Sequence, residues 1–223
     1  MNDKTMSGEQ VYKKIYDAIR LNKLKPNIRL REDDLAEAFK VSRTIVRQAL
    51  QHLSYNKMIC LEKNKGATVY YPSERESKEI FHTRKVLEKS CIDDVIGNLN
   101  DGNVNNLRKI CEKELENLIS NELKESLLNS GDFHLQFVSI SNNFVLSDIV
   151  EELIARTTLI ISAYSNKTTM GCSCGGHLEF LEYLINHDKS KCLEWIESHY
   201  DQMLNNLDFN GLDNNKLIDT IFQ

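Results

Sequence analysis

The stretch "VSRTIVRQALQHL", residues 41–53, decides the fold of the first third of the chain. Ser42 is placed to cap a helix of about residues 42–55, because its hydroxyl can accept a hydrogen bond from an amide of the first turn. The apolar residues recur at helical spacing, which predicts one buried face: Val46, Leu50 and Leu53.

The opposite, polar side of this helix carries Arg43, Thr44 and Arg47 at its N-terminal end. A shorter helix of residues 33–39 precedes it, and Lys40 and Val41 form a tight turn between the two. Two short helices joined in this way predict a helix-turn-helix. In that motif the N-terminal end of the second helix enters the major groove of DNA.

The flanking segments complete a small module. The segment "MICLEKNKGATVYY" (residues 58–71) has two β-prone runs, 58–61 and 68–71, around a Lys-Asn-Lys-Gly tip, which predicts a hairpin that forms a wing. An earlier amphipathic helix includes Val11 and Ile15, and the proline of "KPN" (residues 25–27) is expected to end it. These patterns alone are equally compatible with a three-helix bundle that carries a surface hairpin.

Composition favours helices throughout. The 223 residues include only two prolines and nine glycines. The chain does not begin with a signal-like apolar run, and no stretch approaches the length of a membrane span, so we expect a cytoplasmic protein with no membrane partner. The six cysteines are then expected to be reduced core residues.

Charge is unevenly distributed along the chain. Residues 1–72 carry 14 Lys and Arg against 8 Asp and Glu, a net +6, whereas residues 73–223 carry 14 against 25, a net −11. The polar, proline-containing segment "YPSERES" (residues 71–77) lies where the balance changes. We therefore expect a DNA-binding domain of residues 1–72 and a larger acidic domain of residues 73–223.

The segment "LKPNIRLREDDLAEAFKVSRTIVRQALQHLSYNKMICLEKNKGATV" (residues 24–69) closely resembles the winged helix-turn-helix of GntR-type bacterial transcription regulators, above all in its "VSRTxVRxAL" core. The resemblance implies binding to double-stranded DNA. By position it implies that Arg43 and Arg47 touch bases or phosphates and that Thr44 holds the DNA backbone. It also implies that two wing-tip residues approach the minor groove, Lys65 and Gly66. Ser42, at the start of the same helix, completes the expected DNA-binding set.

Several positions depart from the family pattern. Ile45 replaces the usual proline, and Asn27 and Lys57 replace usual glycines. Asp33 stands where some members use a DNA-contacting arginine. Because a carboxylate there would repel phosphate, either this region is presented differently or DNA affinity depends more on the recognition helix.

Beyond residue 77 the sequence predicts only helices, since period-two stretches are lacking. The expected helices span roughly residues 75–97, 103–120, 123–141, 144–165, 176–187 and 189–206. The fold class is therefore mostly α, with an N-terminal winged helix-turn-helix and a C-terminal all-α antiparallel bundle. Such bundles hold ligand sites between facing helices.

Three of the six histidines, His134, His177 and His199, lie on the apolar faces of their own helices. One such histidine is most often a hydrogen-bonded core residue. Three from three helices favour a shared purpose, because burying imidazole rings is costly. The other three histidines show no such pattern and are expected at the surface or in the scaffold: His52, His82 and His187.

The segments "TRKVLEKSCIDD" (83–94), "FHLQFVSISNN" (133–143) and "GHLEFLEYLINHDKSKCLEWIESHYDQML" (176–204) resemble signatures of the FCD ligand-binding domain, which follows the GntR winged helix in one large subfamily. The resemblance implies that His134, His177 and His199 hold a divalent metal ion, commonly zinc, nickel or manganese. It further implies that a small carboxylate effector completes the coordination.

The family's fourth ligand is an aspartate four residues before the first histidine, and Ser130 stands there in this chain. Asp132 is close, but two residues along a helix is about 200°, which turns its carboxylate away from His134. It could substitute only if the helix were unwound near Gly131. A site of three neutral imidazoles would depend more strongly on an anionic effector.

Arg84 lies within the first of these segments, residues 83–94. Arg84 is expected either to pair with an effector carboxylate through its forked guanidinium or to form an ordinary i,i+4 surface pair with Glu88.

Cys172 and Cys174 in "GCSCGGHLEF" (171–180) are interpreted as loop thiols, because no cation nearby would lower their pKa.

The leading functional hypothesis is a homodimeric, ligand-responsive repressor that binds a palindromic operator and is not an enzyme. A metal-dependent enzyme is the alternative from another class, since three histidines with an open position also form catalytic zinc sites. Against it, no Asp or Glu lies at an evident spacing to act as general base. A metal sensor without an organic effector is the third hypothesis.

Overall fold

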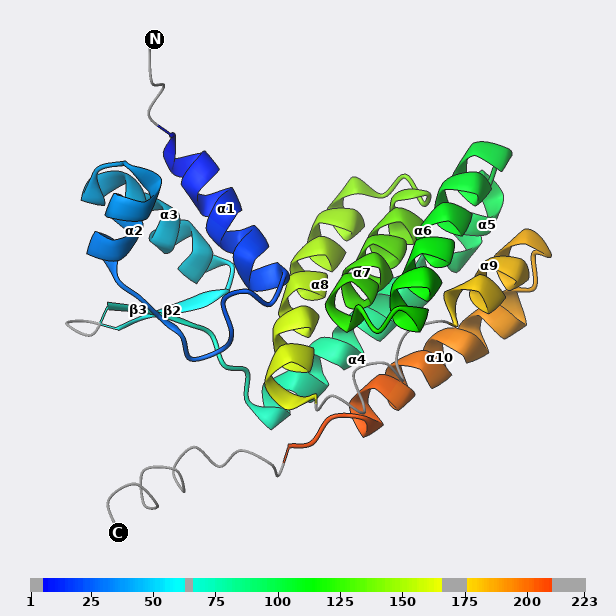
Figure 1. The fold of residues 1–223 in the computed structure, drawn as a ribbon. Coiled ribbons are helices and arrows are strands. Elements are labelled where there is room, and N and C mark those ends of the chain that lie inside the picture. The colour runs from blue at the N-terminus through cyan, green and yellow to red at the C-terminus, as the bar shows by residue number, and fades with distance from the viewer. Residues whose placement is uncertain (1–5, 63–65, 166–175, 210–223) are drawn as a thin grey trace.

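The computed structural model describes residues 6–62, 66–165 and 176–209 (Figure 1). Over these residues the chain is mostly helical, with one small sheet, so the predicted fold class is confirmed. In chain order the helices and strands are α1 Gly8–Arg20, β1 Arg29–Leu30, α2 Glu32–Phe39, α3 Arg43–Tyr55, β2 Ile59–Glu62, β3 Gly66–Val69, α4 Glu74–Ser90, α5 Ile92–Asn98, α6 Asp101–Ile119, α7 Leu123–Ser139, α8 Phe144–Tyr164, α9 His177–Ile185 and α10 Lys189–Asn205.

The helix-turn-helix forms as the sequence predicts. The Ser42 hydroxyl accepts a hydrogen bond from the Ile45 amide and caps α3. Lys40 ends α2 in the left-handed conformation, with φ 54°, which makes the turn tight. The apolar face of α3 packs against α1, and its buried residues include those predicted: Val46, Leu50 and Leu53.

Two predictions for this region need correction. Helix α1 ends at Arg20, before the "KPN" segment, because the chain turns through Leu21 and a positive-φ Asn22. The wing is part of a three-stranded antiparallel sheet of order β1-β3-β2, and the two-residue β1 was missed. Strands β2 and β3 pair from Ile59 opposite Val69 to Glu62 opposite Gly66. Strand β1 is too short to show alternation in the sequence.

The second region consists of helices α4 to α10, with no strand among its described residues. The expected helix of residues 75–97 is in fact two, α4 and α5, because the chain breaks at Cys91. Helix α7 packs against both α6 and α8, and α10 packs against α4 and α9. A core of buried apolar side chains joins these helices, centred on aromatic residues such as Phe133, Phe137 and Phe180.

Helix α8 joins the two regions, since α1 lies beside it in Figure 1. Ala155 and Leu159 of α8 belong to the apolar core of the winged helix rather than to that of the bundle. The Ser162 hydroxyl also donates to the Asn22 side-chain oxygen at 2.6 Å. The bundle therefore contacts α1, which is the helix against which α3 packs.

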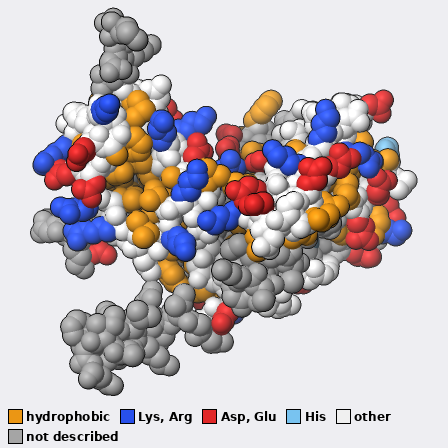
Figure 2. All heavy atoms as spheres, in the orientation of Figure 1, with side chains coloured by type: hydrophobic (Ala, Val, Ile, Leu, Met, Phe, Trp, Pro, Cys, Tyr) orange, Lys and Arg blue, Asp and Glu red, His pale blue; other side chains and the backbone are white. Residues whose placement is uncertain are grey.

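The surface reflects the uneven charge of the sequence. In Figure 2 Lys and Arg side chains gather around the winged-helix region on the left, whereas Asp and Glu are more frequent over the bundle on the right. Among the described residues, no helix is both long enough and apolar enough to cross a membrane.

Candidate functional site

The exposed end of α3 presents the predicted DNA-binding side chains in one place. Ser42, Arg43, Thr44 and Arg47 are all exposed there. Gly66 opens β3 with φ 89°, a conformation that suits glycine. Lys65 lies outside the described residues.

Both recognition-helix arginines are paired with carboxylates of α2. The Arg43 guanidinium lies 2.7 Å from Asp33, and Arg47 donates two hydrogen bonds to Glu32, at 3.1 and 2.7 Å. The hydrogen bond from Arg47 lowers the pKa of the Glu32 carboxyl. The sequence analysis expects Asp33 to repel phosphate. In the structure Asp33 also pairs with Arg43, one of the two arginines that are expected to attract phosphate.

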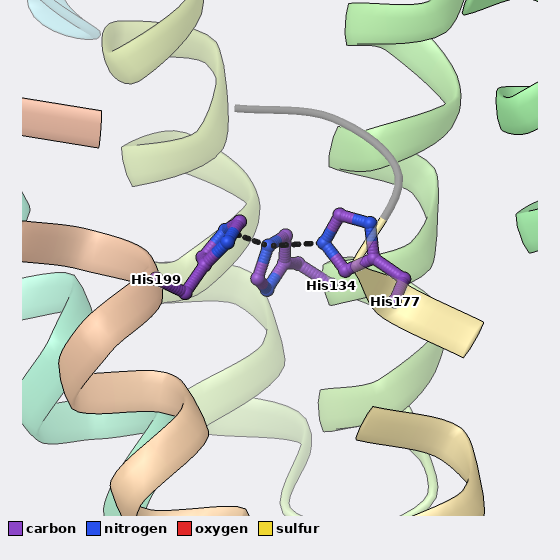
Figure 3. A group of neighbouring side chains, drawn as sticks. All are labelled: His134, His177 and His199. Carbon is purple, nitrogen blue, oxygen red and sulfur yellow. Dashed lines mark hydrogen bonds between the residues drawn. The ribbon is translucent and has the colours of Figure 1, made fainter. Parts of the chain in front are cut away.

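The second candidate site is a buried cluster of three histidines, His134 from α7, His177 from α9 and His199 from α10 (Figure 3). One ring nitrogen of each lies within 4.8 Å of the others. The His134 Nε2 atom is 3.2 Å from Nε2 of both His177 and His199. The expectation that all three face the apolar side is confirmed, because none exceeds 8% exposure.

Two buried carboxylates orient two of these rings. Nδ1 of His134 lies 2.7 Å from Glu88 of α4, and Nδ1 of His177 lies 2.7 Å from Glu114 of α6. Each carboxylate oxygen accepts a hydrogen bond from the ring that it contacts, so both Nδ1 atoms carry the proton. The Nε2 atoms of His134 and His177 then face each other as lone pairs, an arrangement that a cation between them would stabilise.

Burial favours the neutral form of two of the rings, His134 and His199. Burial lowers the pKa of His134 to about 4, against the opposing charge of Glu88, and burial also lowers the pKa of His199 well below its ordinary value. The Trp195 indole stacks on His199 with ring centroids 4.5 Å apart, and Phe133 lies 4.5 Å from His177. Neutral imidazoles are the form that binds metal ions.

Arg84 lies in the same interior, next to the histidine cluster. The predicted i,i+4 pair with Glu88 is present, but Arg84 is 2% exposed, so the pair is buried and does not lie at the surface. Its Nε donates to Glu88 at 2.8 Å and its Nη1 donates to the Thr157 hydroxyl at 2.9 Å, whereas Nη2 has no hydrogen-bond partner among the described residues. Burial alone would raise the pKa of Glu88, but His134, Arg84 and a hydrogen bond from Tyr200 lower it to about 2.

Ser130 occupies the position of the family's fourth ligand. Ser130 is buried, one helical turn before His134. Helix α7 continues through Gly131 without unwinding, and a Cβ there would lie 3.0 Å from Ile154 of α8, so glycine permits the close packing of α7 on α8. Asp132 instead pairs with Arg20 of α1 at 3.0 Å, and therefore points away from the histidines as expected.

Sequence reasoning missed both orienting carboxylates, although a signal existed. Glu114 shares a buried stripe of α6 with Leu107 and Cys111, and Glu88 shares one of α4 with Phe81 and Arg84. An acidic residue on such a stripe indicates a buried partner.

The described cysteines are free thiols, and Cys172 and Cys174 lie outside the described residues.

A winged helix-turn-helix is a DNA-binding architecture, and in this chain it is joined to a helical bundle with an internal polar centre. Residues 7–69 match the bacterial regulatory proteins of the gntR family, and residues 79–202 match the FCD domain. The chain belongs to the GntR family of transcriptional regulators, in the group that carries an FCD domain. Members of this family bind DNA operators, and FCD domains often bind a metal ion.

Named relatives agree with this membership. The chain is 31% identical to the Uxu operon regulator of Haemophilus influenzae over 55% of this chain and 49% of that protein, so it spans about half the length of that relative. It is 26% identical to the Nta operon transcriptional regulator of Aminobacter aminovorans over 81% and 86% of the two chains. It is 34% identical to the gluconate operon transcriptional repressor of Bacillus licheniformis over 52% and 48%. These relatives are regulators rather than enzymes.

Solved structures share the fold. A GntR transcriptional regulator from Rhodococcus sp. RHA1 superposes with a TM-score of 0.78 at 20% identity, over 89% of this chain and 97% of the other. The E. coli McbR/YncC structure gives a TM-score of 0.77 at 21% identity, over 97% and 98% of the two chains. The winged helix and the bundle therefore recur together in known folds.

Proposed function

We propose that this chain is a homodimeric repressor that releases a palindromic operator in response to a small carboxylate effector. Residues 1–72 bind DNA, and residues 73–223 bind a divalent metal ion and the effector and hold the dimer together. The observation that carries the proposal is the close approach of the Nε2 atoms of His134 and His177, which lie 3.2 Å apart in the FCD domain of a DNA-binding regulator.

The donor set fits a divalent metal ion. Nitrogen atoms bound to one tetrahedral ion at about 2.0–2.1 Å lie roughly 3.3 Å apart. The Nε2 atom of His134 lies 3.2 Å from the Nε2 atoms of His177 and His199, and the three ligand nitrogens all lie within 4.8 Å of one another. Glu88 and Glu114 supply the outer carboxylates that fix the tautomer of metal-binding histidines. His134, His177 and His199 would hold zinc, nickel or manganese, which supplies a Lewis-acid centre for an anionic ligand.

The metal is tested by elemental analysis of the purified protein. The double variant His177→Ala/His199→Ala is expected to lose bound metal. His82→Ala/His187→Ala is the matched control, because it removes two exposed imidazoles. Equal metal content in both double variants would refute the site.

The effector is proposed to be a carboxylate because Arg84 offers it a buried donor. Nη2 of Arg84 has no partner among the described residues, and the guanidinium is held by Glu88 and Thr157 close to the histidines. One relative is named for the gluconate operon, and gluconate is a sugar acid. A sugar acid would place its carboxylate between the metal ion and Arg84.

Thermal-shift measurements with gluconate and other sugar and hydroxy acids, with and without zinc, test the effector class. Arg84→Lys keeps the charge that compensates Glu88 but removes Nη2, so it should abolish the shift while leaving the protein folded. A shift that is unchanged in Arg84→Lys would contradict the role of Arg84. If operator affinity followed zinc alone, the protein would be a metal sensor without an organic effector.

DNA binding is proposed to use the exposed end of α3 and the wing. The residues involved are Ser42, Arg43, Thr44, Arg47, Lys65 and Gly66. In a dimer two recognition helices occupy half-sites about 34–36 Å apart, which matches a palindromic operator. An effector that changes how the bundles pair would change this separation and lower operator affinity.

Arg47→Ala should abolish operator binding in an electrophoretic mobility assay while the circular dichroism spectrum stays unchanged. Arg75→Ala is the matched control, because Arg75 is also an exposed arginine paired with a glutamate, Glu79, but on α4. Sequence-specific binding retained by Arg47→Ala would overturn the assignment of α3 as recognition helix.

A further inference from the structure

A cleft of about 780 Å³ lies between the winged helix and the bundle, and its lining includes neither the Ser42–Arg47 end of α3 nor the histidine cluster. Helices α1 and α3 form one wall and helices α7 and α8 the other. Its volume falls in the range of small-molecule sites, which occur preferentially between domains. The proposed function makes no use of this cleft.

One wall of the cleft is aromatic. The ring of Tyr12 stacks on His52 with centroids 4.0 Å apart and an interplanar angle of 20°, and on Tyr16 with centroids 5.7 Å apart. Asn56 donates to the Tyr12 hydroxyl at 2.8 Å and fixes that ring. The faces of aromatic rings attract cations.

The opposite wall is acidic. Glu151, Glu152 and Asp148 of α8 are exposed to the cleft, and no ion pair links them to a cation within the described ranges. Burial and then the charge of Glu151 raise the pKa of Tyr16. The lining as a whole has six carboxylates against two cations, Lys13 and Arg20, and Arg20 is already paired with Asp132.

We propose that this cleft binds an organic cation, with alkyl-ammonium groups lying over the rings of Tyr12 and Tyr16 and directed to the carboxylates of Glu151 and Glu152. An anion of the kind proposed for the histidine site would be repelled here, so the two sites select ligands of opposite charge. The occupant would touch both α1, which packs on α3, and α8. Its binding would therefore be linked to the placement of the recognition helix.

Spermidine is a suitable probe, titrated calorimetrically into the full chain at about 0.15 M salt, where exposed charges are screened beyond roughly 8 Å. We expect saturable binding of one spermidine per chain. The isosteric double variant Glu151→Gln/Glu152→Gln should weaken it at least about tenfold, since each carboxylate contributes one charge pair. The matched control is Glu112→Gln/Glu116→Gln, which removes two exposed carboxylates from α6 and should leave affinity unchanged.

A second pair of variants tests the aromatic wall. Tyr16→Phe keeps the ring and should keep the affinity, whereas Tyr16→Leu should weaken spermidine binding while thermal melting verifies that the protein is folded. Absence of saturable binding, equal losses in the two glutamine double variants, or displacement by Mg²⁺ at matched ionic strength would overturn the proposal. Because the titration uses neither DNA nor added zinc, its failure would leave the proposed repressor function untouched.

Discussion

Glu114 of α6 accepts a hydrogen bond from Nδ1 of His177 at 2.7 Å, and neither side chain is more than 1% exposed. This contact joins two residues that are 63 positions apart along the chain. It fixes which nitrogen of the ring carries the proton, so it leaves the Nε2 lone pair directed at His134. A carboxylate in this position orients the imidazole for binding a metal ion.

Replacing Glu114 by glutamine should therefore weaken metal binding. Glu114→Gln keeps an acceptor oxygen for His177 but removes the charge, and we expect zinc affinity to fall by about 10- to 100-fold. Competition with a chromophoric chelator measures it. Glu116→Gln, an exposed residue of the same helix, should leave zinc affinity unchanged. Equal affinities in both variants would show that Glu114 does not act on the metal site.

Ser130→Asp should strengthen metal binding, because it places a carboxylate on the same face of α7 as His134, one turn away. An anionic fourth donor offsets the charge of the ion, and we expect a gain on the order of tenfold, or about 1.4 kcal/mol. The same chelator competition serves as the assay. Asp132→Asn is the companion variant: because Asp132 pairs with Arg20 outside the cluster, zinc affinity should not change. A loss in Asp132→Asn would mean that Asp132 is a ligand.

The sequence permits prediction of features that depend on neighbours along one helix. Ser42, Val46 and Leu50 define α3 because capping and apolar spacing are local properties. The burial of His134 follows from its helical stripe for the same reason. Strand β1 could not be predicted, since two residues have no periodicity and their only support is the pairing with β3.

The contacts that give the sites their chemistry are long-range, and this is why they escaped prediction. Glu88 meets His134 across 46 residues, and nothing in the α4 stripe indicates which group it will meet. The sequence predicts that Asp33 would repel phosphate, but it does not reveal the pairing with Arg43, because that pairing depends on how tightly α2 turns onto α3. Local sequence patterns identify which residues are buried or exposed. The partner of each side chain depends on how the helices pack together, which these patterns do not show.

Acid should weaken the protein partly through Glu197 of α10. Hydrogen bonds from Lys85 and from Lys89 of α4 lower its pKa from the ordinary value of 4.5 to about 2. A carboxyl with a lowered pKa in the folded state stabilises the fold above pH 4.5, and this contribution is lost as the pH falls toward 2. Glu197→Gln should therefore be less stable than the wild type at pH 6, and the difference should shrink as the pH falls.

Urea denaturation at pH 6, 4 and about 2.5 measures this difference, which salt should reduce because Glu197 is about half exposed. Glu194→Gln, on the same helix but without a lysine partner among the described residues, should show no comparable pH dependence. A gap between wild type and Glu197→Gln that stays constant down to pH 2.5 would contradict the role of the ion pairs.

Asp33→Asn should tighten operator binding. Asp33 lies 2.7 Å from the Arg43 guanidinium, so DNA must compete with this carboxylate for the arginine and must also approach its negative charge. Removing the charge frees Arg43 for a base or phosphate, and we expect affinity to rise by about three- to tenfold. The slope of log affinity against log salt should steepen by about one phosphate contact, or roughly 0.9.

Asp34→Asn separates this effect from net charge alone. It removes the same charge one residue further along α2, where the carboxylate lies 3.9 Å from Arg31 and does not touch Arg43. If release of Arg43 is the cause, only Asp33→Asn steepens the salt dependence, whereas Asp34→Asn changes affinity little. If both variants tighten binding equally, the Asp33–Arg43 pair does not restrain the recognition helix, and the repulsion between α2 and the phosphates accounts for the whole effect.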